Sequence, residues 1–360
     1  MHKLINSIKT RFLPEVKSIH LYSLMYTSGC AGLTLILSFV SNIIWTHYFS
    51  PATLGSFRII ITITNIAAAF SLLGISTAIM MSCAENTHGN FRILIRRKLV
   101  ANGCIAIVLF FFTQIYFSYT EYEDLAANLI LVTALLFPIF NLTDIWSTWM
   151  NGNKAFGRLA VGRILRALLA CASIAAFAIF PTIKLFYFLA LYFGLIGIMN
   201  ILYIYSLKKE IKNDIVNSQT LTFSNHSSIA FIFGSLLLLD VILLGHFFSL
   251  EDVAIYAVAL IFPELTKSIW AVINQLIAPY AFGSKSLSVF WKKFRSIILA
   301  TSFLWFLLGI AGFILLPTLI PIFFTNTYSD SIPYAQALWL GYCWCAPGAF
   351  FSNSLLSTKK

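Results

Sequence analysis

The chain has 360 residues, of which 59% are hydrophobic and only 10% charged, with 34 phenylalanines and a mean hydropathy of +0.86. Soluble globular domains are about 45–50% apolar, so this composition excludes them and indicates an integral membrane protein. The net charge of +11 would suggest nucleic acid in a soluble protein, but the basic residues cluster between long apolar runs. This pattern is typical of topology signals, and we expect no nucleic-acid partner.

The first apolar run, Leu21–Phe49, is far longer than the core of a cleavable signal peptide, which spans about 7–15 residues. We therefore expect it to persist as a transmembrane helix. Residues 1–20, which precede it, form a basic lead whose apolar residues recur at helical spacing as far as Pro14. This predicts an interfacial helix on the inner leaflet.

Ten apolar runs are long enough to cross a bilayer, since a helix needs about 20 apolar residues to span the hydrocarbon core. The predicted fold class is an all-α polytopic membrane protein with about 10 transmembrane helices. The predicted spans are 21–48, 57–83, 99–119, 126–150, 159–180, 185–206, 227–248, 253–282, 296–324 and 334–356.

The distribution of charge predicts the orientation of these spans. The N-terminal tail and every second loop hold 21 of the 24 basic residues, whereas the alternate loops are acidic, with Lys184 as an exception. Basic loops stay on the cytoplasmic side, so both termini are expected in the cytoplasm. The basic clusters are Lys3, Lys9, Arg11, Lys17; Arg92, Arg96, Arg97, Lys98; Lys154, Arg158, Arg163, Arg166; Lys208, Lys209, Lys212; Lys285, Lys292, Lys293, Arg295; and Lys359, Lys360.

An internal repeat organises the chain. Thr46–Phe57 recurs as Gly245–Tyr256, 199 positions later, with seven of twelve positions identical or near-isosteric. The same shift aligns the basic clusters that follow Phe91 and Phe290. Helix 7 therefore restarts the pattern of helix 1, which predicts two parallel-repeat bundles of six helices about an axis along the membrane normal.

This repeat divides the chain into an N-lobe (1–206), a cytoplasmic linker (207–226) and a C-lobe (227–360). The linker is expected to be solvated. The C-lobe contains four predicted helices, two fewer than the N-lobe, so we expect the second bundle to be truncated.

Polar residues within the spans predict a central cavity. Helix 8 carries a polar stripe, helix 2 carries polar residues at matching positions, and helix 7 carries one carboxylate. Lipid cannot satisfy such groups, so we expect helices 1, 2, 7 and 8 to line the cavity. The candidate residues are Arg58, Asn65, Asp240, Glu264, Lys267, Asn274 and Gln275.

Alternative interpretations of these charges remain open. Glu264 and Lys267 are three residues apart and could form an ion pair that Asp240 caps. Arg58 lies close to a helix end, where it could extend to the interface. A further set, Asp144 with Arg163 and Arg166, is explained by a structural salt bridge plus topology charge.

Enzymatic activity is not expected. The sequence contains no G-x-x-x-x-G-K-[ST] loop and no H-E-x-x-H motif, and its predicted outer loops are too short to hold an active site. All six cysteines lie inside apolar runs, so we expect neither disulfides nor a structural zinc site. We predict no catalytic residues, cofactor or resident metal.

Several stretches resemble bacterial polysaccharide repeat-unit (O-antigen) flippases of the multidrug/oligosaccharidyl-lipid/polysaccharide exporter superfamily. The resemblance covers nearly the whole chain. The chain differs from the usual pattern in having ten rather than twelve predicted helices and Ala254 in place of glycine. The similar stretches are Tyr48–Phe57, Leu72–Ala78, Trp149–Arg158, Asp240–Gly245 and Val253–Ala257.

The resemblance implies alternating access and translocation of an undecaprenyl-diphosphate-linked oligosaccharide across the cytoplasmic membrane, for export of surface polysaccharide such as lipopolysaccharide. Polysaccharide polymerase and chain-length proteins are the expected protein partners. In this hypothesis Lys267 and Arg58 neutralise phosphate or acidic sugar, and the amides of Asn65, Asn274 and Gln275 bind the headgroup. Asp240 and Glu264 would couple transport to a proton or sodium ion (H+ or Na+).

Two other functions are considered. A multidrug-and-toxin extrusion transporter of the same superfamily would use the cavity carboxylates to bind cations, although Lys267 would oppose them. A membrane polymerase or ligase acting on the same lipid-linked glycan would be an enzyme, but such enzymes usually need a large outer loop.

Overall fold

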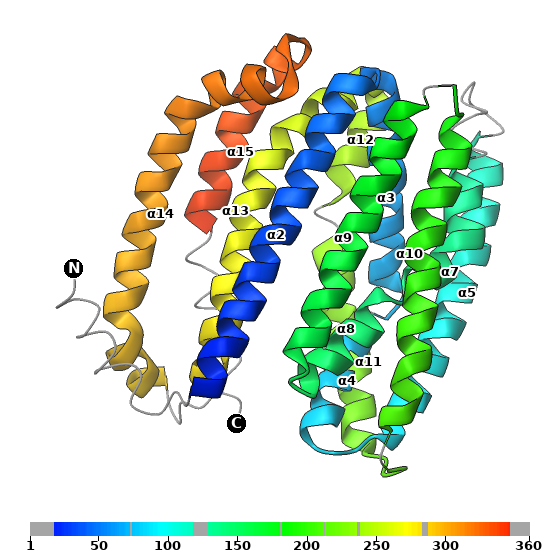
Figure 1. Ribbon diagram of the computed structural model, residues 1–360, viewed down its shortest axis with the longest axis vertical. Helices are drawn as coiled ribbons and strands as arrows, with labels where there is room; N and C mark the ends of the chain where they lie inside the picture. Colours follow the sequence, from blue (N-terminus) through cyan, green and yellow to red (C-terminus); the bar gives the residue numbers. More distant parts are fainter. Residues whose placement is uncertain are drawn as a thin grey trace.

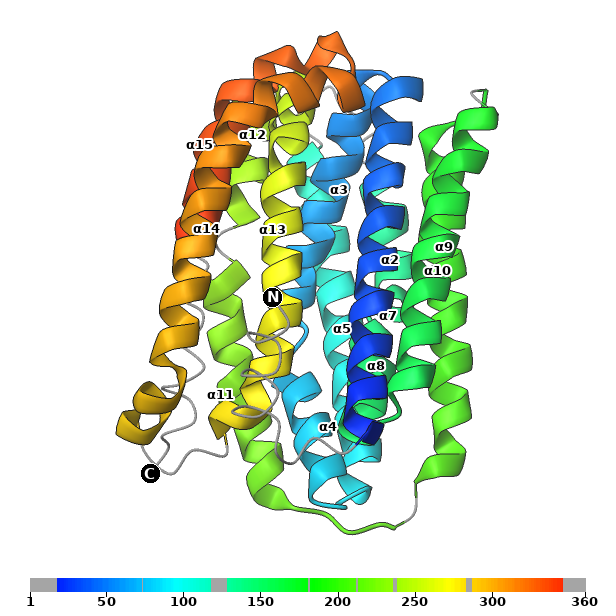
Figure 2. The same cartoon turned by 60° about the vertical axis from the view of Figure 1, so that its left-hand side comes forward.

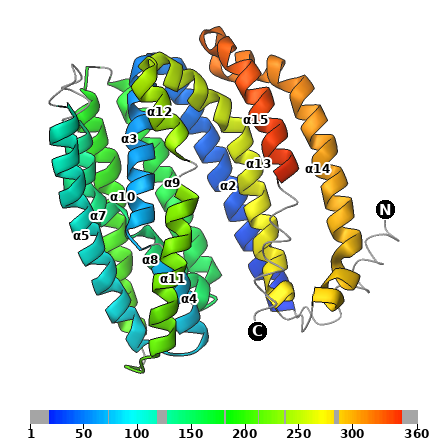
Figure 3. The ribbon, with the colours of Figure 1, turned by 180° about the vertical axis from the view of Figure 1, so that it is seen from behind.

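The computed structural model describes residues 18–72, 74–117, 128–180, 182–211, 213–235, 238–282 and 287–345, with side chains from Gly29 to Ile269 and Leu299 to Trp344 apart from isolated positions. Every regular element in these ranges is helical, which confirms the predicted all-α fold. The helices run roughly side by side along the long axis. Helices α13, α14 and α15 lie on one side, α5, α7 and α10 lie on the other, and α2 and α3 lie between them (Figures 1 and 3).

The helices agree with the predicted spans in most places, although several are interrupted. Seven segments in the described part are long and apolar enough to cross a membrane: α2, α3, α5, the run from η1 to α8, α9, α10 and much of α14. The elements are α2 (Ser18–Tyr48), α3 (Pro51–Phe70), α4 (Gly74–Ala84), α5 (Gly89–Phe117), η1 (Leu131–Leu136), α7 (Phe137–Phe140), α8 (Thr143–Gly152), α9 (Phe156–Ile179), α10 (Leu185–Leu207), η2 (Lys208–Glu210), α11 (Ser218–Ser235), α12 (Leu239–Phe247), α13 (Leu250–Phe282), α14 (Leu287–Phe324), η4 (Asn326–Ser331) and α15 (Ile332–Cys345).

In the C-terminal half, one predicted span is divided into two helices, one is a single helix, and one is only partly described. The predicted span 227–248 is two helices, α11 and α12, rather than one. The predicted span 253–282 lies within α13, and 334–356 is described only as far as Cys345, the end of α15. The expected interfacial helix falls almost wholly on residues 1–17, which lie outside the described ranges, as do Lys359 and Lys360.

The predicted span 57–83 is also interrupted, because the chain turns between α3 and α4. Helix α3 ends at Phe70 and is capped by Ser71. The next residue, Leu72, has a left-handed φ of 59°, so the helix does not continue. The next helix begins at Gly74, which is in close contact with α11: a Cβ there would lie 2.3 Å from the carbonyl oxygen of Ser224. The run 128–152 is also interrupted, by the turn at Asn141 and Leu142 between α7 and α8.

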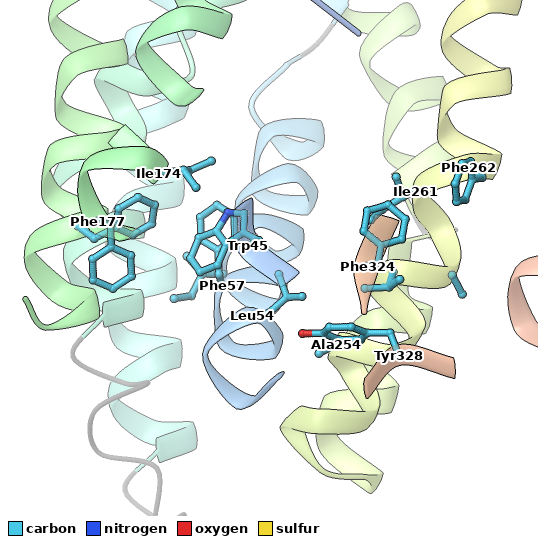
Figure 4. Close-up of a cluster of buried hydrophobic side chains, with 14 of the residues drawn as sticks. Trp45, Leu54, Phe57, Ile174, Phe177, Ala254, Ile261, Phe262, Phe324 and Tyr328 are labelled. Carbon is cyan, nitrogen blue, oxygen red and sulfur yellow. The ribbon is translucent and has the colours of Figure 1, made fainter. Parts of the chain in front are cut away.

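An aromatic and aliphatic core connects the two sides of the molecule (Figure 4). Phe177 stacks on Phe188 with ring centroids 4.6 Å apart, and Trp45 stacks on Phe57 at 4.6 Å. The same buried cluster continues through Ala254 of α13 to residues of α14 and η4. The packing therefore joins α2, α3, α9 and α10 to the helices of the second repeat.

The repeated stretch forms two turns at the same end of the molecule, between α2 and α3 and between α12 and α13 (Figure 1). Each turn is stabilised by capping. The Ser50 hydroxyl accepts a hydrogen bond from the Thr53 amide, and the Ser249 hydroxyl donates to Asp252. The two turns touch, because a Cβ at Gly55 would lie 1.9 Å from the carbonyl oxygen of Leu250.

The described part of the linker is bound to the turn between α4 and α5, although most of its residues are exposed. Amide side chains on both segments exchange hydrogen bonds with the opposing backbone, and this fixes the linker against the turn. Helix α11 then packs along α4, as Figure 2 shows. The contacts include His88 N to Asn213 Oδ1 (3.0 Å), Gly89 N to Ile215 O (3.0 Å), Asn217 N to Asn90 Oδ1 (3.0 Å), Asn217 Nδ2 to Glu85 Oε2 (3.0 Å) and the ion pair Arg92–Asp214 (3.1 Å).

We predict that Gly55→Ala lowers the free energy of unfolding by about 1–3 kcal/mol, because the new methyl group would overlap the backbone of Leu250. The matched control is Gly103→Ala on α5, where no atom lies within 4 Å of the new Cβ. Thermal unfolding of both purified variants in detergent measures the difference. A Gly55→Ala protein as stable as the Gly103→Ala protein would contradict this contact.

Candidate functional site

A polar cavity of about 520 Å³ lies within the first half of the molecule, with one contribution from the second. It is lined by α2, α3, α8, α9 and α10, and by Glu264 of α13. The helices that line it are otherwise apolar, so the polar residues are concentrated on the faces that meet here. The polar lining residues are Thr34, Ser38, Ser41, Asn42, Arg58, Thr143, Asp144, Ser147, Arg163, Arg166, Tyr192 and Glu264.

Arg58 occupies the wall formed by α2 and α3. Its guanidinium donates a hydrogen bond to Asn42 Oδ1 on α2, and it interacts electrostatically with Glu264 of α13. Its Nε is buried and has no hydrogen-bond partner among the described residues. Arg58 therefore lines the cavity, as one of the two alternatives predicted.

Two further arginines, Arg163 and Arg166, lie one helical turn apart on α9 and form what we name the α9 arginine pair. Arg166 lies over the ring of Phe140, 5.6 Å from its centroid, and interacts electrostatically with Tyr192. In the described part of the chain, the cations that form salt bridges are Arg92 and Arg158. No described carboxylate forms an ion pair with the α9 arginine pair. The cavity is consequently richer in cations than in anions.

The interpretation of Asp144, Arg163 and Arg166 as a structural salt bridge is wrong. No ion pair joins them in the described structure, and all three line the cavity. The sequence did contain a signal: Arg163 and Arg166 are spaced by three near the start of an apolar span, so both fall on one face of the helix.

A buried amide positions the α8 wall. Asn200 of α10 is fully buried, and its Oδ1 accepts hydrogen bonds from Trp146 Nε1 (2.9 Å) and Thr143 Oγ1 (3.2 Å). Its Nδ2 donates to the carbonyl oxygen of Phe140 (2.8 Å), which is freed by the turn before α8. One side chain thus satisfies the interrupted backbone and orients two residues that line the cavity.

The other predicted site residues lie outside this cavity. Asn65 and Lys267 are exposed, and neither lines the cavity. The side chains of Asn274 and Gln275 lie outside the described part, although both positions belong to α13. Among the described side chains, helix 8 contributes Glu264 and helix 7 contributes no lining residue, whereas the prediction placed both helices in the wall.

Asp240 belongs to a second polar group, between α12, α13 and α15. Its Oδ2 accepts a hydrogen bond of 2.6 Å from the Tyr256 hydroxyl, and its Oδ1 accepts one from the Val241 amide. Tyr342 of α15 interacts electrostatically with both Asp240 and Glu264. The described residues contain no group of three or more metal-ligating side chains.

Solved transporter structures share this fold. An outward-facing multidrug resistance MATE family transporter of the MOP superfamily gives a TM-score of 0.62 at 11% identity, covering 93% of this chain and 83% of its own. A MOP superfamily transporter from Pyrococcus furiosus, described by the reverse polarity of its binding pocket, gives 0.59 at 11%, covering 93% and 84%. The MATE transporter ClbM in complex with Rb+ gives 0.56 at 14%, covering 94% and 83%.

No family model and no curated protein sequence matches the chain. At such low identities the structural likeness establishes the fold, which is that of the MATE transporters of the MOP superfamily. This agrees with the superfamily that the sequence resembles.

We predict that Asn200→Leu lowers the free energy of unfolding by about 3 kcal/mol, because the donors of Trp146 and Thr143 and the carbonyl of Phe140 lose their shared partner. Asn65→Leu, which replaces an exposed amide, is the control and should change stability little. Thermal unfolding measures both effects. The hypothesis fails if the two variants unfold at the same temperature.

Proposed function

We propose that this chain is a membrane transporter that binds an anionic headgroup in the α2–α3–α8–α9 cavity and moves it across the bilayer by alternating access. The fold shared with MATE and other MOP transporters supports transport as the general function. Internal repeats with a polar site between helices are the usual basis of such a mechanism.

The single observation that supports an anionic substrate is the α9 arginine pair, which has no carboxylate partner among the described residues. Arginine side chains bind phosphate oxygens through paired N–H donors, and their charge is always retained. Arg58 adds a third cation to the cavity lining. Glu264 and Asp144 only partly offset these charges.

The proposed substrate is an undecaprenyl-diphosphate-linked oligosaccharide, moved across the inner membrane of a bacterium. The diphosphate would bind the arginines, and the hydroxyl and amide groups of α2 and α8, such as Ser38, Asn42 and Ser147, would hydrogen-bond the sugars. The prenyl tail would stay in lipid, because only the headgroup has to be shielded from hydrocarbon. Asn65, Lys267, Asn274 and Gln275 are proposed to contact the headgroup along the path outside this cavity.

Ion coupling is proposed for the Asp240 group. Asp240 and Glu264 both interact with Tyr342, so a proton or sodium ion bound at one carboxylate would be sensed at the other. Glu264 also interacts with Arg58 in the cavity. This electrostatic coupling would connect the proposed ion site to the proposed anion site.

A cation-coupled multidrug exporter is the alternative, and the descriptions of several structural neighbours favour it. In that case Asp144 and Glu264 would bind an organic cation directly. The P. furiosus neighbour is described as having a pocket of reverse polarity that suggests a different function, and this precedent favours the anionic substrate for the arginine-rich cavity. The charge of the bound ligand distinguishes the two functions.

We predict that replacing both Arg163 and Arg166 by Gln weakens the binding of a fluorescent farnesyl diphosphate about hundredfold or more, since each charge-assisted contact contributes about 1.5–3 kcal/mol. Lys184→Gln, which removes an exposed charge at the end of α10, is the control and should bind as the wild type does. Purified proteins in nanodiscs are compared by fluorescence anisotropy.

The same proteins are titrated with ethidium, an organic cation. Tight ethidium binding by the wild type, without binding of farnesyl diphosphate, would contradict the anionic substrate and support the exporter. Restoration of surface polysaccharide in a flippase-deficient bacterium by the wild type, but not by the double variant or Lys267→Ala, would support the lipid-linked glycan.

A further inference from the structure

Lys98 of α5 is a buried cation that does not line the cavity. Its side chain is 1% exposed, although its neighbours in the basic cluster, Arg96 and Arg97, are exposed as expected of topology charges. A charged group buried between membrane helices is costly and is usually kept for a specific role. The sequence pattern grouped Lys98 with the topology charges and did not predict its burial.

A polar network holds the Lys98 ammonium in place. Its Nζ donates a hydrogen bond of 2.9 Å to Ser71 Oγ, at the turn between α3 and α4. Asn141, at the turn between α7 and α8, donates to the same Ser71 oxygen and to Asn102 Oδ1 on α5. Asn102 in turn donates to the Pro138 carbonyl oxygen at 3.0 Å. Two interrupted helices are thereby tied to α5, and the position of the ammonium is fixed relative to α8.

Asp144 is the acidic residue next to this network in the chain: it lies one helical turn after Asn141, whose side chain shares the Ser71 oxygen with Lys98. Of the elements packed against α5, η1 and α7 contain no ionisable side chain, α4 contains only Cys83, and α3 contains only Arg58. Helix α8, which follows α7 after a short turn, supplies Asp144, and this carboxylate interacts electrostatically with Lys98. The two groups do not form a direct ion pair in the described structure.

Asp144 also lines the cavity, beside the α9 arginine pair. Glu264 lies within electrostatic range of Arg58 in the cavity, and Asp144 lies within electrostatic range of Lys98 behind the wall. The α9 arginine pair is therefore the one cationic group of the cavity without a carboxylate partner among the described residues.

We propose that Lys98 is a positioning residue that determines the charge selectivity of the cavity: it neutralises Asp144 from behind, so that Arg163 and Arg166 stay available to an anionic ligand. This inference rests on the proposed function. Without Lys98, the Asp144 carboxylate would oppose an incoming anion and attract the arginines or a cation instead. Selectivity of this kind depends as much on removing a repulsive group as on adding an attractive one.

The test compares the binding of inorganic diphosphate and of the tetraphenylphosphonium cation to the purified protein by isothermal titration calorimetry. Lys98→Gln should weaken diphosphate binding about tenfold and strengthen cation binding, as expected for an uncompensated carboxylate in the site. Arg97→Gln is the matched control, because it removes an exposed charge one residue away and should alter neither affinity.

Three more variants separate an electrostatic role from a structural one. Lys98→Arg should keep the wild-type preference. The double variant Lys98→Gln/Asp144→Asn should recover diphosphate binding, since removing the carboxylate makes the neutralising cation unnecessary. Asp144→Asn alone should bind diphosphate at least as tightly as the wild type, which tests the inference even if Lys98→Gln does not fold.

Unchanged selectivity in Lys98→Gln, loss of binding that Asp144→Asn does not restore, or weaker diphosphate binding by Asp144→Asn alone would each overturn the inference and leave the proposed function intact. A wild-type protein that binds no diphosphate would overturn the proposed function, and this inference with it.

Discussion

The structure depends on how charges buried between membrane helices are satisfied. Lipid offers neither hydrogen bonds nor solvation to an ion, so each ion has to find partners within the protein. Arg58 finds them in Asn42 and Glu264, and Lys98 finds one in the Ser71 hydroxyl. The α9 arginine pair has no such carboxylate in the described chain. A cation that the protein leaves uncompensated is available to a ligand, and this connects the energetics of the fold to its proposed substrate.

The same constraint explains where the helices are interrupted. A turn within the hydrocarbon frees backbone groups that must be bonded inside the protein. The turn after α3 lies against Lys98 through Ser71, and the turn before α8 is bonded by Asn200 and Asn102. These buried polar side chains fix the α8 residues that line the cavity. The interruptions therefore shape the site. The polar side chains that hydrogen-bond the interrupted backbone also place polar groups next to the cavity.

Much of the fold could be predicted, because hydrophobic length and the repeat are properties of the sequence itself. The spans, and the paired turns at Ser50 and Ser249, follow from these signals. Arg58 and Glu264 could be predicted as cavity residues because charges inside apolar spans require protein partners. The interruptions could not be predicted, since they depend on tertiary contacts such as that of Gly74 with α11. The α9 arginine pair was missed because it lies at the start of its span, where a topology charge is the simpler explanation.

The central claim is that the cavity between α2, α3, α8 and α9 binds an anionic headgroup through Arg163 and Arg166. An experimental map of the protein in a lipid nanodisc with bound farnesyl diphosphate tests it most directly. The account predicts diphosphate density within hydrogen-bonding distance of both guanidinium groups, with the prenyl chain directed toward lipid. Density beside Asp240 and Tyr256, or a cavity that stays empty at saturating ligand, would contradict it.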